Sequence, residues 1–430
     1  MGAMTTTPPG WAATSIWWHV YPLGALGADT TGADRDCRRP LSALIDWLDH
    51  AVALGVNGIA LGPIFTSATH GYDTLDYFTI DERLGDRGDF DALVAACRSR
   101  GLRLMLDGVF NHVSREHDRV ADTDAARGVA RRHRDGTVAT FEGHDGLVEL
   151  DHRAPEVADL VVDVMCHWLD AGVDAWRLDA AYAVPPAFWR AVLPRVRQRF
   201  PEVYVLAEVI HGDYPAFVAD SGVDSVTQYE LWKAFWSSIV DGNMHELQWA
   251  LTRHEQMLTT FVPWTFVGNH DVTRIATRLL EWSVDLSIVL LATLPGTPAI
   301  YYGDELGWTG TKEERVGGDD AVRPVLPETP PADDVLPPVY RLHQRLLGIR
   351  RRLPDIERAR VQTLVVDQGL LVYRVHTGQP ITVALNANRS STDVTVELGT
   401  TGHLDSERSH REGDMIHLDP GGWYIAGTES

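Results

Sequence analysis

The chain has 430 residues, of which 44% are hydrophobic, and a formal net charge of −22. This length and composition suffice for one large soluble domain with a sizeable core and a smaller second domain. The acidic balance argues against a nucleic-acid partner and against an anionic membrane, because both surfaces attract clustered Lys and Arg. We therefore expect neither partner.

The cysteines and the N-terminal residues bear on the cellular compartment. Cys37, Cys97 and Cys166 lie far apart without a CxxC pair, which is typical of reduced thiols. The sequence contains no run of about 18 apolar residues, as a membrane span requires. Residues 1–9 lack the basic and apolar regions of a signal peptide. We expect a cytoplasmic protein, whose oligomeric state the sequence does not predict.

Short β-rich runs alternate with amphipathic stretches along most of the chain. The expected strands are residues 15–21, 58–61, 102–106, 175–178, 203–207, 225–228, 265–267 and 299–302. The clearest helical patterns are residues 41–54, 90–100 and 156–171. Eight strands, each followed by helical or insert-bearing chain, close naturally into a (β/α)8 barrel. The sequence therefore predicts an α/β fold of this type.

Two segments depart from this alternation. Residues 113–146 are polar, basic and glycine-containing, and their length predicts a small inserted subdomain after the third strand. From residue 355 to 430 the pattern changes to a period of two with turn signals, which predicts an antiparallel β domain of sandwich type. The predicted catalytic barrel comprises residues 11–112 and 147–354.

Polar residues with catalytic chemistry follow four of the expected strands. They are Asp107 to His112 after the third strand, Arg177 to Asp179 at the fourth, Glu208 at the fifth and Asn269 to Asp271 at the seventh. The carboxyl ends of barrel strands form the active site in this fold. Carboxylates at four strand ends, two of them beside histidines, therefore indicate an acid-based site, and none of these segments resembles a phosphate-binding glycine loop.

The environments of these carboxyls predict different roles. Arg177 and Asp179 are two residues apart on a strand and face the same side, and a neighbouring arginine favours an ionised carboxylate, as a nucleophile requires. Glu208 follows an apolar run, where desolvation raises the pKa and keeps an acid protonated. With Asp271 as a third negative charge, the set suits an oxocarbenium-like transition state. Ion pairs or loop caps explain any one of these residues, but not all four strand ends together.

The same segments resemble the four signature regions of the α-amylase superfamily, glycoside hydrolase family 13. The matching patterns are DxxxNH at Asp107 to His112, RxD at Arg177 to Asp179, the glutamate at Glu208 and NHD at Asn269 to Asp271. The likeness extends over most of residues 15–350, including residues 70–77, 147–151 and 296–305, and favours α-glucosidase-like and neopullulanase-like members. It implies a (β/α)8 glycosidase.

The resemblance assigns roles to the central residues. Asp179 is the implied nucleophile, Glu208 the general acid and then base, and Asp271 the residue that binds and distorts the sugar. Arg177 holds Asp179, and Asp107 supports the architecture behind Arg177. Residue chemistry and resemblance thus agree on a reaction with retention of configuration, with the carboxyls of Asp179 and Glu208 about 5 Å apart.

Further residues are implied to contact the substrate. Tyr72 would stack beneath the sugar ring, and His112 and His270 would hydrogen-bond its hydroxyls. Asp73 occupies a position that, in members acting at a chain end, pairs with an arginine to clamp the terminal sugar, and Arg323 is the candidate arginine. The alternative interpretation of Arg323 is a surface arginine beside a proline-containing loop.

The sequence predicts no required cofactor, with calcium as the candidate to test. Asn111 occupies a position where calcium-binding amylases place a ligand, although the insert that completes their site is short here. Asp29, Asp34 and Asp36 form an acidic loop, and such oxygen clusters can hold a hard cation. A solvated acidic loop is the commoner explanation of this second cluster.

The predicted function is hydrolysis of short α-linked gluco-oligosaccharides from a chain end, with a small carbohydrate as the partner. In α-glucosidase-like relatives, a small residue after the nucleophile accompanies α-1,4 bonds, and Ala180 is such a residue. The alternative function is an α-glucosyl transferase or isomerase of the sucrose, trehalose or maltose type, in which a sugar replaces water in the second step.

Two further classes of protein, a non-catalytic binding protein and a metal-dependent enzyme, fit the residues at the strand ends less well. A non-catalytic amylase-like binding protein would be expected to lose at least one of Asp179, Glu208 and Asp271, and all three are present. A metal-dependent barrel enzyme would need a clustered set of His, Asp or Cys ligands, which the sequence does not display.

Overall fold

The computed structural model describes residues 7–121, 129–315, 317–398 and 401–427. Eight parallel strands form one sheet in the order β10-β9-β8-β5-β2-β1-β12-β11. A parallel bridge between Thr227 and Trp264 joins its two edges and closes the predicted barrel. The strands are β1 (Trp17–Val20), β2 (Gly58–Leu61), β5 (Arg103–Gly108), β8 (Ala175–Leu178), β9 (Tyr204–Ala207), β10 (Ser225–Val226), β11 (Trp264–Phe266) and β12 (Thr297–Tyr301).

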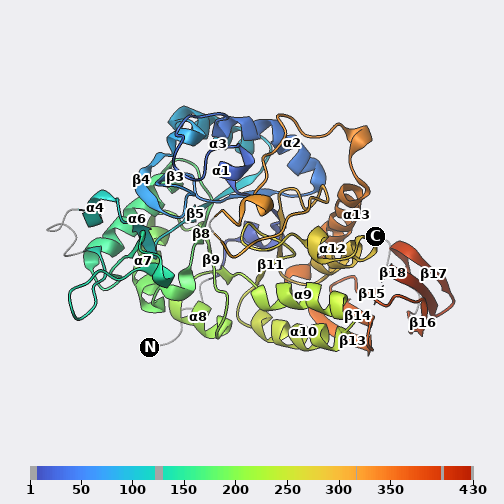
Figure 1. The fold of residues 1–430 in the computed structure, drawn as a ribbon. Coiled ribbons are helices and arrows are strands. Elements are labelled where there is room, and N and C mark those ends of the chain that lie inside the picture. Colours follow the sequence, from blue (N-terminus) through green and yellow to red (C-terminus); the bar gives the residue numbers. More distant parts are fainter. Residues whose placement is uncertain (1–6, 122–128, 316, 399–400, 428–430) are drawn as a thin grey trace.

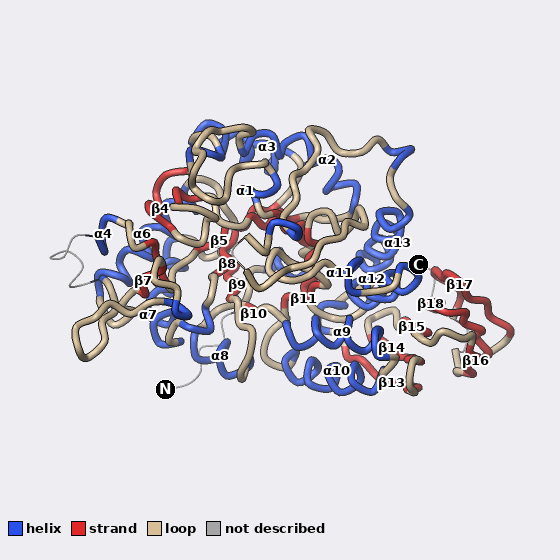
Figure 2. Tube along the Cα trace, viewed as in Figure 1, coloured by secondary structure: helices blue, strands red, loops and turns tan. Residues whose placement is uncertain are grey.

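Helices between the strands cover the outside of the barrel (Figures 1 and 2). In α6 (Pro155–Asp170), a proline in the first turn suits the helix start, and one apolar face is buried. In α3 (Arg87–Ser99), a capping box of Asp86 and Asp89 fixes the N-terminus. The other helices are α1 (Pro22–Ala25), α2 (Ile45–Leu54), α4 (Asp118–Ala121), α7 (Pro186–Arg199), α8 (Tyr214–Ser221), α9 (Tyr229–Asp241), α10 (Met244–Leu258), α11 (Ile275–Arg278), α12 (Val284–Thr293) and α13 (Pro338–Arg352).

Two short hairpins extend from the barrel on the side of the strands' carboxyl ends. The first pairs β3 (Phe65–Ser67) with β4 (Thr74–Ile80), and the second pairs β6 (His112–Ser114) with β7 (Leu147–Glu149). The second hairpin brackets the predicted insert, of which residues 122–128 lie outside the described residues. The insert lies at the opposite side of the barrel from the C-terminal strands (Figure 1).

The C-terminal strands are antiparallel, as the sequence predicted, and hydrogen bonds join the six of them into one sheet, while the sandwich type stays a prediction. The strands are β13 (Arg360–Val366), β14 (Leu370–His376), β15 (Ile381–Asn386), β16 (Thr392–Thr395), β17 (Gly402–Glu412) and β18 (Met415–Gly427). The first part of β18 pairs with β16, and its last part pairs with β15. One long strand thus serves both halves of the sheet.

The barrel and the C-terminal sheet share one apolar core. A single cluster of buried residues includes Leu290 of α12 together with Leu371, Tyr373 and Ile425 of the sheet. The Tyr373 hydroxyl also forms a 2.6 Å hydrogen bond with Thr293. Among the described residues, none of the helices combines the length and apolar character that a membrane crossing requires.

Candidate active site

The acidic residues of the site lie at the ends of neighbouring barrel strands. Asp107 lies in the last part of β5, Asp179 follows β8 and Glu208 follows β9. The parallel register pairs Asp107 with Arg177, and the same register continues from β8 to β9. Because the strands run parallel, these ends meet at one rim of the barrel. Local β-structure and its register therefore bring together the residues that the sequence predicted.

Arg177 lies at the centre of this cluster. Its Nη1 contacts Asp107 and lies 3.3 Å from Oδ1 of Asp179, while its Nη2 lies 2.7 Å from Oε1 of Glu208. The four side chains are at most 10% exposed. One buried guanidinium therefore compensates three buried carboxyls, and Asp107 contacts it directly.

The carboxyl of Glu208 is oriented by three donors. Oε1 forms an ion pair with Nη2 of Arg177 and accepts a 3.1 Å hydrogen bond from the Tyr229 hydroxyl, and Oε2 accepts from the backbone N–H of Ala180 at 3.0 Å. Ala180 has a φ of 44°, a left-handed conformation that costs an alanine on the order of 1 kcal/mol. This turn directs the N–H of Ala180 toward Glu208.

The ionisation of Asp179 differs from the sequence prediction. Burial raises the pKa of Asp179 well above its ordinary value, the carboxylate of Glu208 raises it further, and Arg177 offsets only part of this. Burial likewise raises the pKa of Asp107 to about 6. The prediction considered Arg177 beside Asp179 alone, but the guanidinium is shared among three carboxyls and lies closer to Glu208. Asp179 and Glu208 therefore share one buried cation, Arg177.

Asp271 is held as a carboxylate by two neighbours. Its Oδ2 lies 3.0 Å from Nε2 of His270, and its Oδ1 accepts a 3.0 Å hydrogen bond from Nη2 of Arg323. Desolvation raises the pKa of Asp271, but His270 and Arg323 outweigh it and bring the pKa well below its ordinary value. This agrees with the third negative charge expected from the sequence.

The predicted sugar-stacking residue, Tyr72, lines the cleft. Its ring stacks on His270 with a centroid distance of 5.3 Å and an interplanar angle of 3°. Its hydroxyl contacts Nε2 of His270 and donates to Oδ2 of Asp107 at 3.2 Å. These contacts fix the ring before any sugar is present, so that it forms a rigid part of the cleft wall.

His112 also lines the cleft, but both ring nitrogens already have partners. Nε2 lies 3.0 Å from the carbonyl oxygen of Tyr72, and Nδ1 lies 3.2 Å from Nδ2 of Asn111. The ring stacks on Phe141 of the insert at 4.5 Å. Burial lowers the pKa of His112 to about 4, so that the imidazole is neutral near pH 7. The structure thus assigns His112 contacts within the protein in addition to its place in the cleft.

The predicted pair of Asp73 and Arg323 is not formed within the described residues. Asp73 accepts hydrogen bonds from the backbone N–H and the hydroxyl of Thr69, at 3.1 and 2.5 Å. Arg323 instead pairs with Asp271 and, at 3.1 Å, with Asp319. Each partner is thus engaged by nearer groups, and Arg323 acts on the site through Asp271.

This arrangement predicts the effect of removing Arg323. Arg323→Ala removes a charge-assisted hydrogen bond to Asp271, which is worth about 1.5 to 3 kcal/mol and corresponds to a roughly 10- to 100-fold loss of kcat/KM. If Asp271 binds the sugar at the cleavage site, as predicted, substrates of any length need it, and we expect equal losses on maltotriose and maltoheptaose, measured by initial rates. A clearly larger loss on maltotriose would instead support a chain-end clamp.

Calcium binding at Asn111 stays a prediction. Calcium takes six to eight oxygen ligands. The side-chain amide nitrogen of Asn111 lies 3.2 Å from Nδ1 of His112, and its backbone carbonyl accepts the N–H of Leu150. The described part of the chain contains no group of three or more His, Cys, Asp or Glu side chains that could hold a metal. In the acidic loop, the Asp29 carboxylate accepts hydrogen bonds from Thr31 and Asp34.

A cleft of about 440 Å³ opens over the acidic cluster and exposes Asp179, Glu208 and Asp271 to one space. One of its walls belongs to the insert, where Glu142 accepts a 2.8 Å hydrogen bond from the Tyr182 hydroxyl. This bond ties the insert to the loop after β8. The cleft residues that sequence analysis did not identify are Glu142, Leu147, Tyr182, Ile210, Tyr229, Val272 and Lys312.

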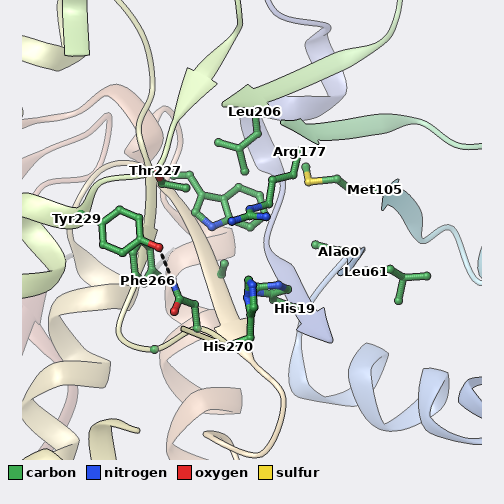
Figure 3. A pocket seen from close by; sticks show the side chains of 14 residues that line it. His19, Ala60, Leu61, Met105, Arg177, Leu206, Thr227, Tyr229, Phe266 and His270 are labelled. Carbon is green, nitrogen blue, oxygen red and sulfur yellow. Dashed lines mark hydrogen bonds between the residues drawn. The ribbon is translucent and has the colours of Figure 1, made fainter. Parts of the chain in front are cut away.

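Tyr229 is the most informative of these residues. It follows β10 by three positions, so its place at the end of the sixth strand was the available signal. Its ring packs edge-on against Phe266 at a centroid distance of 5.0 Å. Figure 3 shows Tyr229, Arg177 and His270 around the small cavity beneath the cleft. Hydrogen-bonding residues therefore continue from the cleft into the interior of the barrel.

A closed (β/α)8 barrel with carboxyls at its strand ends defines a candidate glycosidase, and the comparisons with known proteins agree. The model for the α-amylase catalytic domain matches residues 29–135 and 139–334. The chain therefore belongs to the α-amylase family and is a glycosidase.

Similar proteins with assigned activities lie within the same family. A cyclomaltodextrinase of Geobacillus thermopakistaniensis (strain MAS1) is 28% identical over 470 residues, covering 98% of this chain and 78% of that protein. Neopullulanase 2 of Thermoactinomyces vulgaris is 28% identical over 437 residues, covering 92% and 73%. A solved cyclic α-maltosyl-(1→6)-maltose hydrolase from Arthrobacter globiformis has a TM-score of 0.84 and 26% identity, covering 98% and 100%.

Proposed function

We propose that this protein is a retaining α-glycoside hydrolase that cleaves short α-linked gluco-oligosaccharides, with α-1,4 bonds preferred. The observation that carries the proposal is the shared contact of Asp179 and Glu208 with Arg177 at the base of the cleft. The cleft of about 440 Å³ has the size of a small-ligand site. The names of the similar proteins, a cyclomaltodextrinase and a hydrolase of a cyclic maltosyl-maltose, support small α-glucans as substrates.

In the first step, an Asp179 carboxylate oxygen bonds to the anomeric carbon while the bond from that carbon to the glycosidic oxygen breaks. Glu208 transfers its proton to the departing oxygen, and Asp271 stabilises the positive charge of the sugar. The reaction therefore requires Glu208 to be protonated while Asp179 is ionised. Because the pKa of Asp179 is raised in the protein without substrate, substrate binding must favour the ionised form of Asp179.

In the second step, Glu208 removes a proton from water, whose oxygen bonds to the anomeric carbon. The bond to Asp179 then breaks, and Asp179 leaves as a carboxylate. Two displacements on one carbon restore its configuration. If a sugar hydroxyl takes the place of water, the same steps give transfer instead of hydrolysis.

Release of glucose from a chain end stays a prediction for this protein. The insert supports it, because the bond from Tyr182 to Glu142 restricts one side of the cleft. The contacts of Arg323 do not support it, because this residue pairs with Asp271 and Asp319. Product analysis distinguishes stepwise release of glucose from cleavage inside the chain.

A chromatographic product profile tests the proposal. The protein is incubated with maltose to maltoheptaose, a cyclomaltodextrin, isomaltose, sucrose and trehalose, and products are followed in time. We expect shorter maltose-series products, initially of the α-anomer by NMR, because double displacement retains configuration. Longer or relinked products from added acceptors would indicate a transferase. An initial β-anomer, or no product from any of these sugars, would contradict the proposal.

A further inference from the structure

We propose that Tyr229 is a positioning residue for the general acid: its hydroxyl links the Asn269 amide to Glu208 and holds the Glu208 carboxyl in the orientation needed for proton donation. This inference rests on the proposed function. Tyr229 is the first residue of α9, directly after the sixth barrel strand. Its role depends on the direction of two hydrogen bonds, which the surrounding contacts determine.

The direction of the first bond follows from the amide of Asn269. Its Oδ1 accepts the backbone N–H of Asp271 at 2.9 Å, so the other amide atom is the NH2 group. This Nδ2 donates to the Tyr229 hydroxyl at 2.8 Å, the bond drawn from Tyr229 in Figure 3. Because an amide NH2 can only donate, the hydroxyl accepts here and its own hydrogen is available for another partner.

That partner is Glu208, whose Oε1 lies 3.1 Å from the hydroxyl oxygen. The tyrosine ring cannot turn freely, because it packs edge-on against both Phe266 and Trp232, with centroid distances of 5.0 and 5.8 Å. Burial raises the pKa of Tyr229 well above its ordinary value, so the hydroxyl keeps its hydrogen near neutral pH. Tyr229 thus offers Glu208 a fixed, neutral donor.

Tyr229 differs from the other two partners of Glu208. Arg177 and the backbone N–H of Ala180 can only donate, and a donor-only group favours the carboxylate. A hydroxyl both donates and accepts, so it can remain bonded to Oε1 whether Glu208 is ionised or protonated. Among the contacts of the described residues, Tyr229 therefore provides the one that keeps Glu208 in place throughout the proton-transfer cycle.

The first test is the pH dependence of Tyr229→Phe, which removes one oxygen and keeps the ring. Losing a hydrogen-bond donor to a carboxylate disfavours its ionised form, and the alkaline limb of kcat/KM reports the ionisation of the general acid. We expect this limb to move upward by about half to one pH unit and kcat on maltotriose to fall roughly 10-fold, with KM changed less than about 2-fold. A merely structural role would not move the limb.

The second test uses a leaving group that needs no proton. Fluoride departs from α-maltosyl fluoride without acid assistance, so a defect confined to Glu208 should largely vanish in kcat/KM for this substrate. We expect Tyr229→Phe to lose less than about 2-fold on the fluoride and roughly 10-fold on maltotriose. Equal losses on both substrates, with an unshifted alkaline limb, would overturn the inference.

Two further variants distinguish a specific effect on Glu208 from a general effect of removing a buried hydroxyl, and from a failure of Tyr229→Phe to fold. Tyr373→Phe also removes a buried, hydrogen-bonded hydroxyl, but far from the cleft, and should behave as wild type. A trifluorotyrosine at position 229 strengthens the donor without removing an atom, and should move the alkaline limb downward. It replaces Tyr229→Phe if that variant fails to fold, and an unmoved limb again overturns the inference.

The behaviour of Glu208→Gln distinguishes this inference from the proposed function. Glu208→Gln should lose maltotriose cleavage while retaining kcat/KM on α-maltosyl fluoride. If it does so and the Tyr229 variants do not follow the same pattern, the inference is wrong and the proposed function stands. If Glu208→Gln loses both substrates equally, or the wild type cleaves neither, the role proposed for Glu208 is wrong.

Discussion

Asp179→Asn is expected to lower kcat on maltotriose by at least about 10³-fold, as loss of a covalent nucleophile should. The amide has nearly the shape of the carboxylate but cannot form the glycosyl-enzyme bond. Asp179 also contacts Arg177 at 3.3 Å, and the amide oxygen can keep this contact. The fold should therefore persist, which thermal unfolding measured beside kcat would verify.

A control for Asp179→Asn exists on the same strand. Asp174 precedes β8 at its opposite end, where it pairs with Arg103 at 2.7 Å. Asp174→Asn makes the same chemical change outside the cleft, and we expect its kcat to match the wild type. If Asp179→Asn kept more than about a tenth of the wild-type kcat, Asp179 would not be the nucleophile.

Arg177→Met is expected to lower the free energy of unfolding by about 3 to 5 kcal/mol at pH 7, because it leaves buried carboxyls without their cation. Methionine retains much of the side-chain volume, so the loss reflects charge more than packing. Urea unfolding at a series of pH values measures it. Activity should be lost at the same time, since Arg177 orients Glu208 through a 2.7 Å contact.

The pH dependence of this loss has a definite sign. Burial raises the pKa of Asp107 to about 6 even with Arg177 present, and removal of the cation raises it further, whereas an unfolded Asp titrates near about 4. Above about pH 4 the folded state of the variant binds more protons than its unfolded state, so its free energy of unfolding falls as pH rises. We expect Arg177→Met to be nearly as stable as wild type near pH 4 and increasingly less stable above it.

The exposed pair of Arg103 and Asp174 supplies the comparison for Arg177→Met. The Arg103 side chain is 43% exposed, and such pairs contribute about 0 to 1 kcal/mol. Arg103→Met should therefore change stability little at any pH. A loss for Arg177→Met that stayed constant from pH 4 to 7 would show that packing, not charge, explains it.

The sequence was sufficient for features that follow from strand order. Each of the eight expected strands overlaps an observed one, because short apolar runs ended by turns specify where a buried strand lies. Asp107, Arg177 and Glu208 could be grouped for the same reason: parallel strands place their carboxyl ends at one rim. Knowledge of the loops was not needed for this grouping.

Features that depend on loop conformation or on competition between neighbours could not be predicted. Arg323 lies on a loop whose path brings Asp271 and Asp319 within reach, while Asp73 is satisfied by Thr69. The ionisation of Asp179 depends on how many carboxyls share Arg177, which adjacent residues in the sequence do not reveal. Tyr229 carries no motif: its place after the sixth strand was the available signal, and its contacts identify its role.

The continuous apolar core between the barrel and the C-terminal sheet makes the barrel dependent on the sheet. Leu371 and Ile425 belong to the same buried cluster as Leu290 of α12, so removing the sheet would expose apolar surface of the barrel at a cost of about 25 cal/mol per Å². The barrel's solubility therefore depends on the sheet, although the sheet contributes no residue to the cleft described above.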